Sequence, residues 1–263
     1  MPCWGWGVIL MTSIQADISK IANKLGLSVF AHYDKYLKTT LPFEDNLLHM
    51  LKEQALVVEN ARISRKAKQA GFPVVKTLNT FEISIKRFPY LNINEFQELA
   101  TCRFIEERAD VAAIGPPGHG KTHAALAIGY EAIKRGYNVQ FKRAVDLINQ
   151  MNEAKTEKRL SAYEKNLNKC KLLIIDEVGY LPFDSTACSF LFQIISARYE
   201  TASTFYTTNF EFSKWVEFIK DKRVIIPIVS RIAQHSIVLN MNGPMSWRLE
   251  HARSRDNELF HEL

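Results

Sequence analysis

A glycine-rich loop between an apolar run and a helical pattern constrains the fold of this chain most strongly. Residues 115–122 read Gly-Pro-Pro-Gly-His-Gly-Lys-Thr, which has the spacing of glycine, four residues, Gly-Lys, and Ser or Thr. The apolar run 111–114 predicts a strand before the loop, and residues 123–135 have helical periodicity that ends at Gly136. Glycines let the backbone turn tightly and point several N–H groups at an anion, which the start of a helix also attracts. The segment therefore predicts a phosphate-binding loop rather than an ordinary surface turn.

The loop supplies the candidate ligands of a nucleotide. We expect the Lys121 ammonium to reach the β- and γ-phosphates of ATP, and the Thr122 hydroxyl to hold Mg²⁺. The predicted nucleotide-binding residues are Gly115, Pro116, Pro117, Gly118, His119, Gly120, Lys121, Thr122 and His123.

Two adjacent acids predict the reaction class. Asp176 and Glu177 end the apolar run 172–175, which has the character of a buried central strand. Ligands of open α/β sheets bind beyond the carboxyl ends of the strands, where the glycine loop also lies. We expect Asp176 to bind Mg²⁺ together with Thr122, and Glu177 to orient or deprotonate an attacking water. This pair favours hydrolysis over transfer to a metabolite by a small-molecule kinase; a structural cap at the strand end is the other reading.

Three more side chains are candidates for the site of this subunit or of a neighbouring one. Asn209 follows the candidate strand 204–208 and could hydrogen-bond the γ-phosphate or the water, although asparagine there is often a simple turn former. Arg231 is a candidate for completing the site of a neighbouring subunit by neutralising charge in the transition state. An ordinary surface or ion-paired arginine is the alternative. Arg248 is a weaker candidate for a phosphate contact within its own subunit.

The pattern of the chain changes near residue 105. Before it, helical periodicity occurs over 17–27 and from Pro42 to about Ala70, where Gly71 follows. The apolar face predicted for the second helix consists of Leu47, Leu48, Leu51, Ala55 and Val58. After residue 105, strands alternate with helices, which is typical of a parallel sheet covered by helices.

These patterns predict an α/β P-loop fold, a three-layer sandwich with a parallel central sheet, preceded by a small all-α N-terminal domain. We expect a helical domain with its connector over 13–104 and the nucleotide-binding domain over 105–263. Residues 1–12 are interpreted as a non-native or disordered start, with Met11 as an alternative first residue.

Charge and composition bear on partners and location. The net charge of +6 gives mild support for a polyanionic partner, because lysine and arginine release counterions when they meet phosphates. Candidate DNA-binding residues in the last turns of the second helix are Arg62, Arg65, Lys66 and Lys68. A solvated face that stabilises the helix end is an equal alternative for them. The four cysteines are widely spaced and no apolar run reaches the ~18 residues of a membrane span, so we expect a cytoplasmic protein.

Four segments together resemble a known family. Residues 115–123, 172–182, 207–209 and 239–243 resemble the IstB-like ATP-binding proteins, the helper ATPases of insertion-sequence transposition. That family is related to the DnaC and DnaA branch of the AAA+ superfamily. The resemblance extends from about residue 35 to about residue 250, and the stretch Asp-Glu-Val-Gly-Tyr-Leu-Pro is its most specific part.

The resemblance implies an AAA+ ATPase that forms ATP-dependent homo-oligomers on double-stranded DNA and delivers target sites to a partner transposase. A DnaC-type loader of a replicative helicase is the alternative from the same branch. The positions that match the family's functional residues are Lys121, Thr122, Asp176, Glu177 and Asn209.

Three departures from the family pattern stand out. His119 occupies a position where relatives usually have threonine or another small residue. Ser230 replaces the aspartate that usually precedes the residue matched by Arg231. The carboxyl end is also too short for a full AAA+ lid, so a truncated or absent lid is expected.

Overall fold

The structure, a computed structural model, describes residues 13–38, 40–84, 86–180, 184–215, 222–244 and 246. The start predicted over residues 1–12, Arg248 and the carboxyl end lie outside this part of the chain. The chain separates into two compact units, residues 1–65 and 66–263, which are described in turn. No helix within the described ranges combines the length and apolar character needed to cross a membrane.

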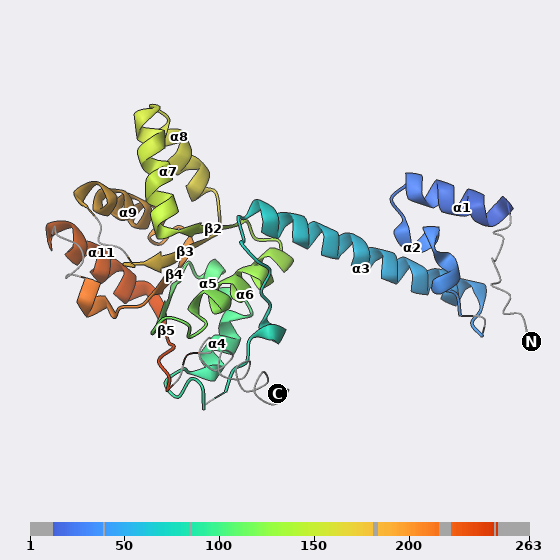
Figure 1. The fold of residues 1–263 in the computed structure, drawn as a ribbon, viewed down its shortest axis with the longest axis horizontal. Helices are drawn as coiled ribbons and strands as arrows, with labels where there is room; N and C mark the ends of the chain where they lie inside the picture. Colours follow the sequence, from blue (N-terminus) through green and yellow to red (C-terminus); the bar gives the residue numbers. More distant parts are fainter. Residues whose placement is uncertain are drawn as a thin grey trace, which may run out of the picture. The chain divides into compact units, whose positions relative to one another are not determined.

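The first unit is helical (Figure 1). Its elements are α1 (Ser13–Lys24), α2 (Ser28–Ala31), the 3-10 turn η1 (Tyr33–Lys35) and the part of α3 (Phe43–Gln69) up to residue 65. The helix predicted from Pro42 to about Ala70 is confirmed as the continuous α3. It stops where Gly71 takes a φ of +81°, a conformation that glycine adopts without the penalty a side chain would bring.

Two polar side chains of α3, those of Asn46 and Gln54, are buried in this unit. Asn46 accepts the Lys38 N–H at 2.9 Å and donates to the Leu41 carbonyl at 2.9 Å, while Gln54 accepts the Val29 N–H at 3.0 Å. These amides satisfy backbone groups of α2 and of the loop before α3, so their burial carries little penalty. The predicted apolar face is instead exposed, at Leu47, Leu48, Leu51, Ala55 and Val58.

The second unit is built on a five-stranded sheet with the order β2-β3-β4-β1-β5, and every described pair of strands is parallel. The strands are β1 (Asp110–Ile114), β2 (Val139–Arg143), β3 (Leu172–Val178), β4 (Ser203–Thr208) and β5 (Ser236–Asn240). The helices among them are α6 (Lys121–Lys134), α7 (Ala144–Thr156), α8 (Leu160–Asn168), α9 (Ser185–Arg198) and α11 (Lys222–His235). The 3-10 turn η3 (Phe212–Lys214) follows β4, and residues 216–220 lie outside the described part.

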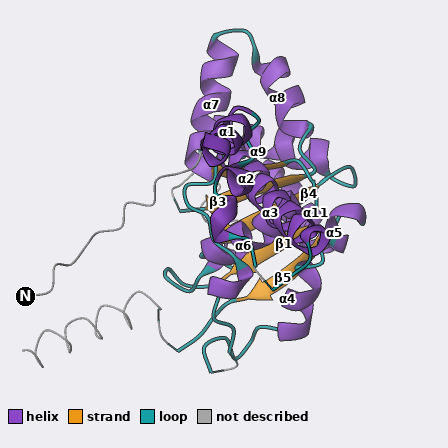
Figure 2. Cartoon of the chain, turned by 90° about the vertical axis from the view of Figure 1, so that its right-hand side faces the viewer, coloured by secondary structure: helices purple, strands orange, loops and turns teal. Residues whose placement is uncertain are grey.

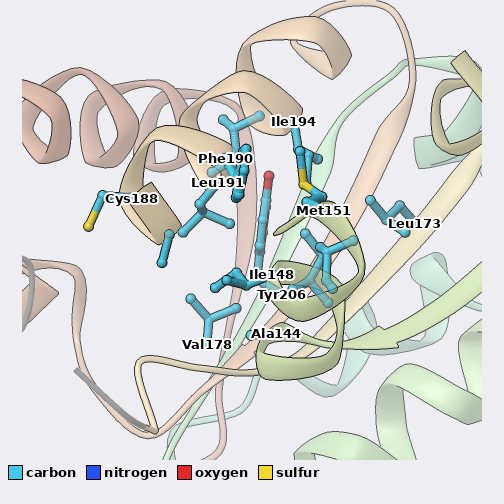
Figure 3. Packing of buried hydrophobic residues seen from close by; sticks show 14 of the residues in the cluster. Ala144, Ile148, Met151, Leu173, Val178, Cys188, Phe190, Leu191, Ile194 and Tyr206 are labelled. Atoms are coloured by element: carbon cyan, nitrogen blue, oxygen red, sulfur yellow. The ribbon is translucent and has the colours of Figure 1, made fainter. Parts of the chain in front are cut away.

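Helices cover both faces of this sheet (Figure 2). Leu173 and Ile175 of β3 belong to a core cluster with α7, α9 and α11 (Figure 3). Ile174, between them, points to the other face, where its Cδ1 atom lies so close to Gly129 of α6 that an added Cβ would be 2.7 Å away. Alternate residues of a strand face opposite sides of the sheet, so the fully apolar run of β3 is explained by burial on both. The predicted three-layer α/β architecture is confirmed.

The connector before β1 packs with the sheet. It contains η2 (Leu78–Thr80), α4 (Ile93–Leu99) and α5 (Arg103–Glu106). The Phe81 ring stacks on Phe88 and Phe96, with centroids 5.7 and 5.2 Å apart, and all three rings are buried. The Phe141 N–H of β2 donates to the Ala70 carbonyl at 2.7 Å. The connector therefore belongs to the same compact unit as the sheet, residues 66–263. The domain boundary expected at 104/105 stays a prediction.

A buried ionic network joins the start of β1 to β4. The Arg198 guanidinium donates to the Thr204 hydroxyl at 3.0 Å and to the Ser203 and Cys170 carbonyls at 2.6 and 3.1 Å. Asp110 accepts the Thr204 N–H at 2.7 Å. Burial raises the pKa of the Asp110 carboxyl to about 7, although the Thr204 N–H and the Arg198 charge both act to lower it.

Candidate nucleotide-binding site

The glycine loop connects the carboxyl end of β1 to the first turn of α6. Gly118 and Gly120 have φ angles of +81° and +79°, in the left-handed region that favours glycine. At Gly115 a Cβ atom would lie 2.7 Å from the Met241 carbonyl oxygen, so the loop starts tight against the segment that leaves β5. The Met241 N–H donates to the Ile114 carbonyl at 2.7 Å and holds that segment in place. The glycines predicted to shape the loop are thus required by backbone angle or by close packing.

Lys121 is the first residue of α6 and its side chain turns back to the loop. The Nζ atom donates to the carbonyl oxygens of Gly115 and Pro116 at 2.7 and 2.8 Å. The residue is only 8% exposed, which is uncommon for lysine without such partners. The geometry holds a positive charge against the backbone that is predicted to surround phosphate.

Asp176 and Thr122 meet at the carboxyl edge of the sheet. The Thr122 hydroxyl donates to the Asp176 Oδ1 atom at 2.8 Å, and Asp176 is 3% exposed. Two segments 54 residues apart in sequence thereby meet at this edge of the sheet.

The neighbouring acid points elsewhere. Glu177 is exposed while Asp176 is buried, and Glu177 has a φ of +61°, which is uncommon for a residue with a side chain. The Thr207 hydroxyl of β4 accepts the Glu177 N–H at 2.9 Å and donates to the Asp176 Oδ1 atom at 2.6 Å. Thr207 belongs to the segment 207–209 that resembles the family, but its sequence indicated no role for its side chain, because a threonine inside a strand has no distinguishing pattern.

Asn209 and Arg231 occupy different parts of the unit. Asn209 follows β4 directly, at a half-buried position, so it lies on the same edge of the parallel sheet as the end of β3. Arg231 belongs to α11 and its guanidinium donates to the Ser196 hydroxyl of α9. It lies 5.2 Å from the ring centroid of Phe192 and 5.9 Å from that of Tyr199. The described contacts of Arg231 are thus with α9 of its own chain.

Two histidines tie the loop to its surroundings. His119 is buried, with Nδ1 3.2 Å from the Pro117 carbonyl oxygen and Nε2 3.2 Å from that of Gly243. Carbonyl oxygens only accept hydrogen bonds and a neutral imidazole has a single N–H, so a neutral ring donates to one of them. His119 therefore packs between the loop and the segment after β5, which gives a structural role to a residue that the sequence left unexplained.

His123, one turn into α6, contacts the connector. Its Nε2 atom lies 3.2 Å from the Thr80 hydroxyl, and its ring centroid is 5.0 Å from that of Phe81. Burial lowers the pKa of the His123 imidazole, and the nearby Lys76 charge acts in the same direction.

The basic residues at the end of α3 differ in their environments. Arg65 and Lys68 are exposed and Lys66 is half-buried. Arg62 forms an ion pair with Glu59 on the preceding turn, with Nε 2.7 Å from a carboxylate oxygen. The Arg62 guanidinium, one of the groups predicted to contact phosphate, is therefore paired with a carboxylate of its own helix.

Comparisons with known proteins agree with this geometry. The family model for IstB-like ATP binding proteins matches residues 24–255. A protein of Geobacillus stearothermophilus named for ATP binding in insertion sequence IS5376 is 35% identical over 246 residues, covering 92% of this chain and 97% of its own length. Among solved structures, the DnaC helicase loader is similar with a TM-score of 0.50 and 24% identity, covering 62% of this chain and 95% of that one.

The replication initiator DnaA bound to AMPPCP and single-stranded DNA is similar with a TM-score of 0.51 and 22% identity. The match covers 62% of this chain and 49% of that DnaA chain. At such identities the two structures bear on the fold alone, and they agree with the α/β fold built on a parallel sheet. The family match and the close relative go further: the chain belongs to the family of IstB-like ATP binding proteins and is an ATP-binding protein and ATP hydrolase.

Proposed function

We propose that this ATPase assembles on double-stranded DNA and regulates target selection by a partner transposase in insertion-sequence transposition. The observation that carries the proposal is the family match over residues 24–255, together with a relative of nearly equal length that is named for an insertion sequence. ATP binding would promote the assembly, and hydrolysis would release it.

In this proposal the backbone of residues 115–123 binds the phosphates of ATP. The Lys121 ammonium exchanges its carbonyl partners, at 2.7 and 2.8 Å, for phosphate oxygens. An ammonium is a mobile point charge on a flexible stem, so this exchange needs only side-chain rotation.

The residues around Asp176 fit a magnesium ion. The Thr122 hydroxyl and the Asp176 carboxylate are hard oxygen donors that already meet at 2.8 Å, and Mg²⁺ prefers such ligands. When bound, the ion would neutralise charge on the β- and γ-phosphates. Thr122 and Asp176 are the residues that would hold it.

Glu177 is the proposed general base. Its exposed side chain stands next to the Asp176 carboxylate in sequence yet faces another direction, so it can accept a proton from water without competing for the metal. Asn209, at the end of the adjacent strand, would orient the water or the γ-phosphate. Arg231 would act on the site of a neighbouring subunit after leaving its contacts with α9.

DNA as a partner is supported by charge. The chain has a net charge of +6, and Arg65 and Lys68 expose their cationic groups on the last turns of α3. Lys66 and Arg62 would add to the contact, the latter after exchange of its Glu59 partner.

The test is turnover and binding with duplex DNA. We expect duplex DNA to stimulate ATP hydrolysis, and ATP to be required for the protein to sediment with DNA as an oligomer. Copurification should capture a transposase. Hydrolysis indifferent to DNA, with no ATP-dependent DNA binding, would contradict the proposal, and stable capture of the replicative helicase instead would favour a DnaC-type loader.

A further inference from the structure

The ladder between β3 and β4 is irregular at the two acids. The strands pair in register from Leu172 with Ser203 to Ile175 with Tyr206, and pairing resumes with Val178 opposite Thr208. Two residues of β3, Asp176 and Glu177, therefore face one residue of β4, Thr207. This is the arrangement of a β-bulge, which redirects a side chain and takes a backbone amide out of the ladder.

The bulge stores backbone strain at Glu177. A φ of +61° is unfavourable for a residue with a side chain relative to extended backbone. Such a conformation persists only when its surroundings hold it. The Glu177 N–H, displaced from the regular ladder, is bonded by the Thr207 hydroxyl oxygen at 2.9 Å.

The same hydroxyl also holds the other acid. Thr207 donates its proton to the Asp176 Oδ1 atom at 2.6 Å, the oxygen that receives the Thr122 hydroxyl as well. A hydroxyl has one proton and two lone pairs, so it can serve the amide and the carboxylate together. Thr207 is 1% exposed, and water cannot readily replace it.

We propose that Thr207 is a positioning residue for ATP hydrolysis: it fixes the bulge that separates the directions of Asp176 and Glu177. The inference rests on the roles proposed for these two acids. Thr207 contacts neither phosphate nor water in this scheme, and acts through the acids. Its loss lets the Glu177 backbone relax toward extended angles, which moves the general base while the glycine loop stays intact.

The test compares Thr207→Val with Thr207→Ser. Valine has the shape of threonine without the hydroxyl, and serine keeps the hydroxyl. We expect Thr207→Val to lower kcat by about 10- to 100-fold, the effect of misplacing a catalytic group by about 1 Å. The KM for ATP and the affinity for a non-hydrolysable ATP analogue should change by less than about 3-fold, because the phosphate-binding loop is not altered. Thr207→Ser should recover most of the lost kcat.

The matched control is Thr204→Val on the same strand. Thr204 is equally buried and its hydroxyl accepts from Arg198 at 3.0 Å, away from the two acids. This variant should lose stability but keep its kcat within about 2-fold of the parental value, since this buried bond supports the fold and touches neither the glycine loop nor the two acids. Melting temperatures of all three variants separate loss of fold from loss of function.

A double variant tests whether Thr207 acts through Glu177. In a Glu177→Gln background, Thr207→Val should cause little further loss in the single-turnover rate, because groups that act as a unit are not additive. The inference is overturned if Thr207→Val turns over at the parental rate, if serine is no better than valine, or if the two losses multiply. All these rates are measured as basal ATP turnover without DNA. A turnover that does not respond to DNA would therefore refute the proposed function, while the comparison of the Thr207 variants would still test the role of Thr207.

Discussion

Replacing Asp110 by asparagine should stabilise the second unit at neutral and alkaline pH. The folded protein holds this carboxyl in a buried position, where burial raises its pKa to about 7 from an ordinary value of 3.8. A group with a raised folded pKa contributes stability that is fully present below the unfolded value and lost as pH rises through the folded one. The parental protein therefore loses stability between pH of about 4 and about 7, and the loss is constant above that.

The magnitude follows from the size of the shift. About three pKa units correspond to about 4 kcal/mol at 1.36 kcal/mol per unit, most of which is lost between pH 5 and pH 8. Asparagine has no charge to bury and its side-chain oxygen can still accept the Thr204 N–H. The stability difference between Asp110→Asn and the parental protein should therefore grow by about 3 kcal/mol from pH 5 to pH 8.

Urea unfolding at the two pH values measures this difference. Trp215 is fully buried in the core of the second unit, so tryptophan fluorescence reports on the relevant transition. Other titrating groups are shared by both proteins and cancel in the subtraction. A difference that is the same at pH 5 and pH 8 would refute the reasoning, because it would mean that Arg198 and Thr204 fully compensate the burial of the charge.

Two further predictions concern the proposed DNA contact and the subunit interface. Arg65→Ala and Lys68→Ala should each weaken binding to duplex DNA of any sequence, and should lower the slope of the logarithm of the binding constant against log salt by about 1. The control Lys20→Ala, on α1, should leave the slope unchanged. Unchanged slopes for both Arg65→Ala and Lys68→Ala would show that these residues do not contact DNA. Arg231→Ala should keep its affinity for ATP but lower the kcat of the DNA-bound assembly by about 10³-fold or more. Mixing it with Lys121→Ala subunits, which retain Arg231, should restore turnover if the arginine acts on the site of a neighbouring subunit. Full turnover by Arg231→Ala alone contradicts the assignment.

The sheet and the phosphate loop could be predicted from the sequence because a local pattern of residues indicates each of them. The buried run ending in Asp176 has no polar interruption, and the glycines of residues 115–120 stand at positions that need a positive φ or close packing. Parallel strands then bring the end of β3 to the loop, and the 2.8 Å contact between Thr122 and Asp176 follows from topology.

Other features depend on tertiary contacts that no local pattern records. Asn46 and Gln54 are buried in the first unit because they satisfy backbone groups of the preceding loop and of α2, while the more apolar face of the same helix is exposed. The bulge opposite Thr207 requires two strands in a particular register, and neither strand alone indicates it. The connector around Phe81 lacks periodicity, yet its rings stack with one another and with His123.

The lifetime of Glu177→Gln on duplex DNA in the presence of ATP tests the central claim most directly. Loss of the general base should slow hydrolysis by about 100-fold or more while ATP and Mg²⁺ still bind, so the assembly should remain on DNA far longer than the parental protein. Lys121→Ala, which lacks the phosphate-binding ammonium, should show no ATP-dependent binding to DNA at all. A Glu177→Gln protein that hydrolyses ATP at the parental rate, or leaves DNA as quickly as the parental protein, would contradict the account.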